Sequence, residues 1–470
     1  MPESIEHPLW EDMQGLILSA YPHLDRARYL LFTIENAAAA RGWLARIQPH
    51  VTNAFKKQEP DGSLHRDRPN MNVNIALTAP GLAKMCGLTG NEPPDGLAQH
   101  LRGFSDAFVE GIHGREHRLR ILGNVGNSAP EHWDWGGTKP GTRPAHLLLM
   151  VFADGDAAAL QAAVDAVMPP FNAMTPVGTL PPTLPLDEAG GREHFGFADG
   201  LSQPILAGSH DAKRFPDSAH ITALGEFVFG YANQDDQPAS PSDDPCERLR
   251  DNGSYLVFCQ FEQDVNGFWN CVDEAAAANG VANPHAAEQL ASKIVGRLPD
   301  GTPLVPYANR NDNEFDYTED PYGYGCPIGA HIRRSNPRDT TDPLHRNRHR
   351  ILRRGRSYGP RASHPREAVG QERGLFFMCL NTDLERQFEF IQQNWTNNPG
   401  FSGLSDECDP LIGAESCPMG RGTFTIQGLP APARLTTLPR FIRVRGAQYF
   451  FLPGIQALHA LAKGECRANP

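Results

Sequence analysis

The sequence of 470 residues lacks the long apolar runs that a membrane span requires. No stretch approaches the roughly 18 apolar residues needed to cross a bilayer. Residues 1–7 contain neither a basic region nor an apolar segment of the kind found in export signals. We therefore expect a cytoplasmic protein without a membrane partner.

Basic charge is also scarce. The chain has 43 Lys and Arg residues against 55 Asp and Glu, a formal net charge of −12 at pH 7. Because binding to phosphates requires clustered basic residues, no nucleic-acid partner is expected. The nine cysteines include no Cys-x-x-Cys pair, so neither a disulfide framework nor a thiolate metal site is indicated. Reduced thiols are the simpler expectation.

What the chain does contain is a unit that occurs four times, an apolar strand-like run followed by a polar turn and an amphipathic helix. The strands are expected at 29–34, 146–152, 254–261 and 375–380, the helices at 38–51, 157–168, 265–278 and 384–395, and companion strands at 71–77, 225–231 and 441–451. Two units with companion strands make one ferredoxin-like domain. The sequence thus predicts an α+β fold with two ferredoxin-like domains, 1–220 and 221–470, each with an antiparallel sheet and peripheral helices.

Three segments carry candidate chemistry. In Phe195-Gly196-Phe197-Ala198-Asp199-Gly200, one carboxylate lies between glycines in an apolar stretch. The others are Ala330-His331-Ile332-Arg333 and the basic run Ile351-Leu352-Arg353-Arg354-Gly355. Each alone has an ordinary interpretation as a turn, a satisfied histidine or a solvated basic face. An acid, a histidine and an arginine together are the parts of a haem peroxidase.

With their flanking residues, these segments resemble the dye-decolourising peroxidases. The resemblance extends through Asn336-Pro337-Arg338, Tyr358-Gly359 and Arg373-Gly374-Leu375-Phe376-Phe377, and it reaches both ends of the chain. The length and the long connections resemble the larger class C/D (class V) subgroup. The resemblance implies a peroxidase with haem b in its C-terminal half. Such an enzyme reduces hydrogen peroxide via a ferryl intermediate and oxidises dyes, phenols and other aromatic donors.

The same resemblance implies roles for individual residues. His331 would be the axial ligand of the iron. Asp199 would shuttle the proton of peroxide, and Arg353 would stabilise the negative charge that develops as the O–O bond breaks. Asp409 looks like the family's acid behind the axial histidine, while Glu389 is the alternative for that position.

Other residues have weaker assignments. Leu375 and Phe377 resemble walls of the peroxide pocket, although they are equally compatible with plain core positions of a strand. Arg333 is expected to contact the cofactor. Large dyes would be oxidised through surface aromatic residues or an access channel, and the candidate relay residues, by residue type alone, are Tyr358, Trp395 and Tyr449.

Two rival functions remain. A haem-binding carrier or sensor of the same fold would bind iron through His331 without turnover, but the presence of both Asp199 and Arg353 argues against it. A haem-free hydrolase could use Asp199 and a histidine such as His194. No Gly-x-Ser-x-Gly or His-Glu-x-x-His motif supports the hydrolase. The sequence does not indicate the physiological reductant, the oligomeric state or any encapsulating partner.

Overall fold

The structure is a computed structural model. It describes residues 8–54, 57–58, 64–65, 70–88, 101, 103–237, 249–278, 284–306, 308, 313–338, 347–368, 370–414 and 422–465. Within these residues, none of the helices has the length and apolar character needed to cross a membrane.

The N-terminal half contains the first two predicted units. Its elements are β1 (Arg26–Ile34), α1 (Ala37–Ile47), β4 (Met71–Leu77), β5 (Leu147–Ala153), α6 (Ala157–Val167) and β6 (Met174–Pro176). The polar turns work as helix caps, because the side chains of Asn36 and Asp156 accept hydrogen bonds from the first turns of α1 and α6. The strand order β4-β5-β1-β6 is that of a ferredoxin-like domain.

The C-terminal half repeats this arrangement. Its elements are β9 (Ser254–Gln263), α10 (Val265–Ala278), β10 (Leu352–Arg353), β11 (Arg356–Tyr358), β12 (Gly374–Asn381), the π-helical segments η7 (Glu385–Glu389) and η8 (Ile391–Thr396), and β15 (Ile442–Leu452). All strand pairs in this half are antiparallel, in the order β10-β12-β9-β15 with β11 also on β12. The predicted α+β fold of two ferredoxin-like units is confirmed.

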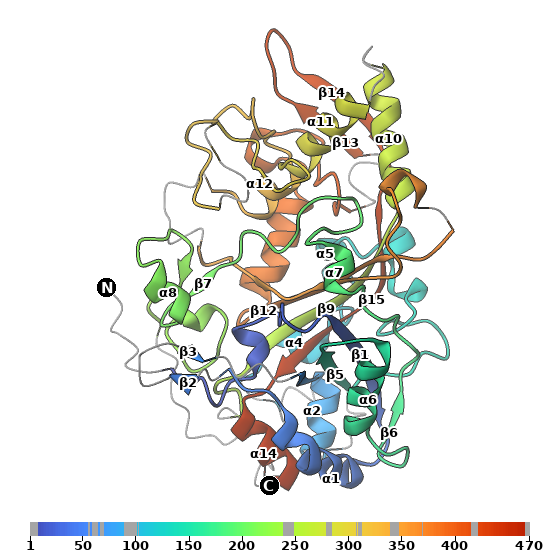
Figure 1. The fold of residues 1–470 in the computed structure, drawn as a ribbon, viewed down its shortest axis with the longest axis vertical. Coiled ribbons are helices and arrows are strands. Elements are labelled where there is room, and N and C mark those ends of the chain that lie inside the picture. The colour runs from blue at the N-terminus through green and yellow to red at the C-terminus, as the bar shows by residue number, and fades with distance from the viewer. Residues whose placement is uncertain are drawn as a thin grey trace.

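The remaining elements connect or cover these two units. They are η1 (Gly15–Ile17), η2 (Gln48–His50), β2 (Lys57–Gln58), β3 (Leu64–His65), α2 (Ala79–Met85), α4 (Asp106–Glu110), α5 (Glu116–Leu122), η3 (Gly126–Ser128), η4 (Pro130–His132), α7 (Leu186–Ala189), β7 (Ile205–Leu206), α8 (His210–Arg214), β8 (Ile221–Thr222), η5 (Leu224–Glu226), α11 (Pro284–Val295), α12 (His331–Ser335), η6 (Pro365–Glu367), η9 (Phe401–Gly403), β13 (Gly422–Ile426), β14 (Ala433–Leu438) and α14 (Ile455–Lys463). Figure 1 shows α10, α11 and α12 toward one end of the molecule and α1 and α14 toward the other.

The predicted companion strand at 225–231 is wrong. The segment begins with the 3-10 turn η5 and folds back on itself, since the backbone N–H of Gly225 donates to the carbonyl of Ala232. Phe227 and Val228 are fully buried there. The apolar run therefore predicted burial correctly, but the backbone is not extended. In the sheet, β10 and β11 take the place of the companion strand.

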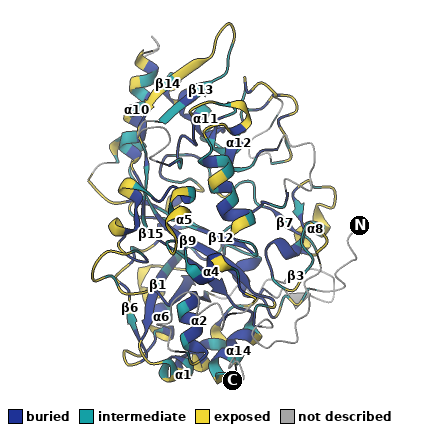
Figure 2. Cartoon of the chain, turned by 180° about the vertical axis from the view of Figure 1, so that it is seen from behind, coloured by how far each residue is buried: buried dark blue, intermediate teal, exposed yellow. Residues whose placement is uncertain are grey.

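Core side chains lie on both faces of the sheet. Along β9, Val257 and Cys259 pack on one face, and Leu256 and Phe258 pack on the other. Figure 2 shows the central strands coloured as buried, while β14 at one end of the molecule is largely exposed. Such burial on both sides explains why the central strands read as continuous apolar runs.

Cysteine behaviour differs from the expectation at one position. Cys86, Cys259, Cys271, Cys326 and Cys379 are free thiols, as expected. Cys408 is disulfide-bonded, and the other half-cystine lies outside the described residues. The prediction of reduced thiols is therefore wrong for Cys408. The spacing of the cysteines along the chain gave no sign of this disulfide.

The two ferredoxin-like units join edge to edge into one nine-stranded sheet, where β15 meets β4. The ladder between these strands consists of a single pair, Phe451 opposite Leu77. Gln14, which is fully buried, extends the junction. Its amide nitrogen donates to the carbonyls of Ile75 (2.8 Å) and Pro453 (2.9 Å), and its oxygen accepts from the Ile75 N–H (2.9 Å).

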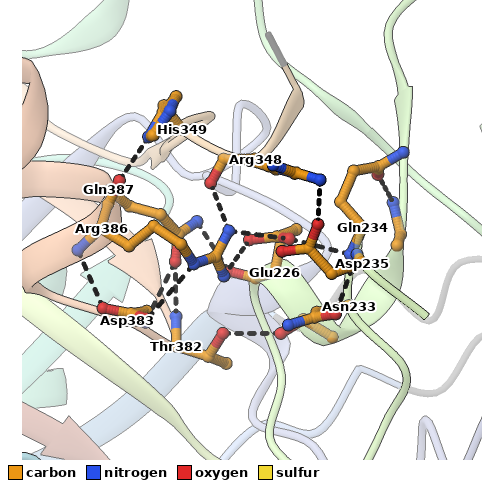
Figure 3. Close-up of polar contacts among 12 residues, drawn as sticks. Glu226, Asn233, Gln234, Asp235, Arg348, His349, Thr382, Asp383, Arg386 and Gln387 are labelled. Carbon is orange, nitrogen blue, oxygen red and sulfur yellow. Dashed lines mark hydrogen bonds and ion pairs between the residues drawn. The ribbon is translucent and has the colours of Figure 1, made fainter. Parts of the chain in front are cut away.

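An ion pair between a buried carboxylate and a partly exposed arginine holds the segment that leads into β10 (Figure 3). Arg386 at the start of the π-helical segment contacts Glu226, whose side chain is fully buried, at 2.8 Å, and it also donates to the carbonyl of Arg348 (2.8 Å). Gln387 donates to the carbonyls of Glu226 (3.0 Å) and Arg350 (2.7 Å). The backbone at 348–350 is thus fixed against the helix and the η5 turn.

Replacing Gln14 by leucine should destabilise the junction between the two units. The variant leaves the backbone groups of Ile75 and Pro453 buried without partners, at a cost of about 1–3 kcal/mol for each. Thermal unfolding should show a lower midpoint. Gln161→Leu on the exposed face of α6 is the matched control, and equal shifts in the two variants would contradict the role of Gln14.

Replacing Arg386 by methionine should be more damaging. The substitution leaves the Glu226 carboxylate buried without its charged partner. Removing one partner of a buried ion pair typically lowers the free energy of unfolding by about 3–5 kcal/mol. The double variant Glu226→Gln with Arg386→Met removes the stranded charge and should recover part of the loss in thermal unfolding. A double variant no more stable than Arg386→Met would argue against this ion pair as the main contribution.

Candidate active site

A cavity opens on the face of β9, β12 and β15 that also packs against the π-helical segment. Including its open mouth, the cavity encloses about 1570 Å³. His331, Asp199 and Arg353 all line it, although they come from three separate segments of the chain. The structure therefore brings together the three residues that the sequence analysis singled out.

His331 is the first residue of α12, and its imidazole bonds a buried acid. Nδ1 lies 2.9 Å from Oδ2 of Asp409, whose side chain is fully buried. The other carboxylate oxygen accepts from the backbone N–H groups of Leu411 (2.9 Å) and Ile412 (3.0 Å). Burial alone would raise the pKa of Asp409, but His331 and these N–H groups outweigh burial and hold the pKa below its usual value.

The open choice between two acids is thereby resolved. Glu389 makes no such contact with His331, because its Oε1 accepts from Arg118 (2.8 Å) and from the Tyr449 hydroxyl (2.8 Å). Asp409 is the acid beside His331. Burial would lower the pKa of His331, but the charge and the hydrogen bond of Asp409 raise it above its usual value.

Arg334 keeps His331 and Asp409 next to each other. Its side chain is fully buried, and it donates to the carbonyls of Trp395 (2.8 Å) and Asn398 (3.1 Å) at the end of the π-helical segment. It also donates to the carbonyl of Glu407 (2.7 Å), two residues before Asp409. One guanidinium therefore ties α12 to the segment that carries the acid.

On another part of the cavity wall, Arg353 lies 3.5 Å from Asp199, and the two side chains are 35% and 39% exposed. The guanidinium also bonds the carbonyl of Leu201. Arg354 lies on the opposite face of the strand, where it donates to the carbonyls of Leu16 and Ile17 at 2.7 Å. The choice of Arg353 over Arg354 as the cavity arginine agrees with this geometry.

Asp199 follows a tight hairpin that the sequence analysis recognised only as a turn. The backbone N–H of Glu193 donates to the carbonyl of Phe197 (3.0 Å), and that of Asp199 donates to the carbonyl of Gly191 (3.0 Å). Gly196 in the turn has φ of +101°, a conformation that favours glycine. Glu193 itself lines the cavity, and sequence reasoning missed it.

Two buried arginines on the cavity wall were also missed as site residues. Arg338 donates to the Ser202 hydroxyl (2.7 Å), and Arg350 donates to the Ser202 carbonyl (3.1 Å). Both arginines therefore bond the loop that follows Asp199. Arg338 belongs to a segment that carries the family resemblance, but only the fold shows that both arginines line the cavity.

The remaining expected contacts divide into two groups. Leu375 and Phe377 both line the cavity, and their role as walls of a peroxide pocket stays a prediction. Arg333 does not belong to the cavity wall. Its buried guanidinium donates to the carbonyls of Asp320 (3.1 Å) and Cys326 (2.9 Å) and lies over the ring of Tyr317. The expected contact of Arg333 with the cofactor stays a prediction, which these contacts do not support.

The three aromatic relay candidates do not form a surface set. Tyr358 and Tyr449 are buried, and the hydroxyl of Tyr449 is bonded to Glu389. Trp395 is partly exposed and lines the cavity. The expectation of surface residues is thus wrong for both tyrosines.

These residues fit a haem. The imidazole of His331 is held by its Nδ1, which leaves Nε2 as the nitrogen that could bind iron. Apolar side chains such as Phe388, Ile391 and Leu411 provide walls for a flat macrocycle. Arg338 and Arg350 place positive charge on the cavity wall, where both guanidinium groups are hydrogen-bonded to Ser202. The described residues contain no group of three or more His, Cys, Asp or Glu that would hold a free metal ion.

Comparison with known proteins agrees with this arrangement. A family model for the C-terminal part of Dyp-type peroxidases matches residues 226–408. The chain is 29% identical to a multifunctional dye peroxidase of Amycolatopsis sp., over 96% of this chain and 95% of the relative. It is 28% identical to a dye-decolorizing peroxidase of Exidia glandulosa, over 95% and 86% of the two chains.

The fold agrees as well. An ancestral D-type dye decolorizing peroxidase superposes with a TM-score of 0.76 at 28% identity, covering 98% of this chain and all of the other. A dye-decolorizing peroxidase in complex with 2,6-dimethoxyphenol gives 0.75 at 26% identity, covering 97% and 99%. The chain therefore belongs to the dye-decolourising peroxidase family, as a haem peroxidase that oxidises dyes.

Proposed function

We propose that the chain binds haem b in this cavity through His331 and there reduces hydrogen peroxide at the expense of phenols and other aromatic donors. The observation that carries the proposal is the hydrogen bond between His331 and the buried Asp409, in the same cavity as the Asp199–Arg353 pair. When bound, haem supplies the iron at which the O–O bond of peroxide is broken.

On the histidine side, the residues of the chain orient and polarise the imidazole of His331. Asp409 accepts a hydrogen bond from the Nδ1–H of His331, which fixes the tautomer and makes Nε2 the ligating nitrogen. Partial negative charge passed to the imidazole makes it a stronger electron donor. Because two backbone N–H groups also bind the carboxylate, Asp409 stays ionised in the interior.

On the peroxide side, the work of the chain is proton transfer and charge stabilisation. The Asp199 carboxylate takes the proton from one peroxide oxygen and delivers it to the other, which leaves as water. Arg353 is permanently charged, and its planar set of donors stabilises the negative charge that develops as the bond breaks. Their separation of 3.5 Å lets both act on one small molecule.

The cavity walls and arginines complete the assignment. Leu375 and Phe377 restrict the space beside Asp199 and Arg353 to small molecules such as peroxide. Arg338 and Arg350 would bind the acid groups of haem b, for which two inward-facing guanidinium groups are suited.

His331→Ala should abolish tight haem retention, because it removes the proposed axial ligand. The ratio of haem to protein absorbance after gel filtration measures the effect, together with peroxide-dependent dye oxidation. His210→Ala on the exposed α8 is the control and should retain haem. Full loading and normal turnover of His331→Ala would refute the ligand assignment.

Asp199→Asn and Arg353→Leu should each slow the reaction with peroxide. Loss of a preorganised donor typically costs about 10²–10³ in rate, and loss of a general base about 10²–10⁴. Stopped-flow mixing with peroxide under pseudo-first-order conditions measures the rate directly. Arg214→Leu on the exposed part of α8 controls for loss of a positive charge. If either site variant reacted as fast as that control, its residue would have no part in the peroxide chemistry.

A further inference from the structure

We propose that Glu193 is the residue that positions Asp199, because its carboxylate fixes the hairpin from which Asp199 projects. The inference rests on the proposed role of Asp199 in the peroxide reaction. Its structural part, the dependence of the hairpin on Glu193, can be tested without reference to that role.

The carboxylate of Glu193 folds over its own turn. Oε2 accepts from the backbone N–H of Phe195 (2.8 Å), and Oε1 accepts from the backbone N–H of Phe197 (2.9 Å). Since the Glu193 backbone N–H also donates to the Phe197 carbonyl, one residue closes the turn three times. Asp199 follows two residues after Phe197, so the direction of its side chain depends on this closure.

A third contact ties the hairpin to the sheet. The amide nitrogen of Gln263, at the end of β9, donates to Oε2 of Glu193 at 2.8 Å. The ring of Phe197 stacks against Trp269, and the indole N–H of Trp269 donates to the carbonyl of Phe195 (3.1 Å). Through Gln263, Glu193 thus links the Asp199 loop to the sheet, while Trp269 supports the same hairpin from α10.

A carboxylate is the group that this geometry requires. It presents only acceptors, and here each oxygen faces one backbone N–H. The isosteric glutamine would place its amide nitrogen opposite one of these N–H groups, so that two donors meet and one hydrogen bond is lost. An exposed carboxylate elsewhere on the hairpin could not substitute for these contacts.

The pH of the experiments below is chosen so that the carboxylate of Glu193 is ionised. Burial raises the pKa of Glu193 to about 7, even though three hydrogen bonds favour its charged form. Asp199 is the titratable group that faces it, and its negative charge adds to the increase, while Gln263 on β9 is uncharged. Measurements at pH 8 therefore compare glutamine with an ionised carboxylate.

The first experiment is hydrogen exchange of the haem-loaded protein at pH 8, followed by mass spectrometry of peptides covering 191–200. Glu193→Gln should lower the protection of one of the two amides, Phe195 or Phe197, by roughly tenfold, as expected for one lost hydrogen bond. Glu188→Gln, an exposed position on the neighbouring α7, is the matched control and should leave the protection unchanged. Unchanged protection in Glu193→Gln would overturn the proposal.

The second experiment is a double-variant cycle on the peroxide rate. If Glu193 acts through Asp199, Glu193→Gln should slow the wild-type reaction severalfold but add nothing in the Asp199→Asn background. Haem retention and the KM for the dye should stay near wild type. Additive effects would show that Glu193 acts independently of Asp199, as a second proton-carrying group in the cavity, and would overturn the positioning role.

Two outcomes keep this inference separate from the proposed function. If Asp199→Asn itself leaves the peroxide rate unchanged, the proposed role of Asp199 fails, whereas the exchange data still test the hairpin. If Glu193→Gln does not fold, Gln263→Leu removes the contact from the sheet side and leaves the carboxylate in place. It should loosen the same two amides, and full protection in that variant would contradict the proposed link to the sheet.

Discussion

The site depends on one buried negative charge, the carboxylate of Asp409, and on its hydrogen bond to His331. The charge is tolerated in the interior because three donors surround it, the His331 imidazole and two backbone N–H groups. In turn, it decides which imidazole nitrogen carries the proton and which faces the cavity. Arg334 secures the arrangement by binding carbonyls on both sides of it. Without this bond the histidine would be free to rotate, and the proposed ligand geometry would be lost.

Buried acids and amides also hold the other functional side chains of the site in place. The functional side chains come from a loop, a strand end and the first residue of a helix, and each is supported by an acid or amide that bonds backbone groups. Glu193 holds the Asp199 hairpin, while Glu226, through Arg386, holds the segment that precedes Arg353. The nine-stranded sheet provides the rigid base for both supports. This division explains how Asp199 and His331, which lie more than a hundred residues apart in the chain, can be held in one cavity.

Much of this could be predicted from sequence, and the failures have physical causes. The strands at 254–261 and 375–380 were predictable because burial on both faces makes them continuous apolar runs. The same signal failed at 225–231, where apolar residues are buried by a compact turn. His331, Asp199 and Arg353 could be found from their motifs, but the inward or outward direction of Arg333, Arg338 and Arg350 depends on α12 and on tertiary packing. Glu193 was invisible, since its partners are backbone groups that no side-chain pattern reveals.

The central claim is that His331 is the axial ligand of a haem in this cavity. Its most direct test is anomalous diffraction at the iron absorption edge from crystals of the haem-loaded protein. The account predicts one strong iron peak within bonding distance of Nε2 of His331, with Nδ1 still bonded to Asp409. His349 also lines the cavity. An iron peak beside His349, or one away from both imidazoles, would contradict the account.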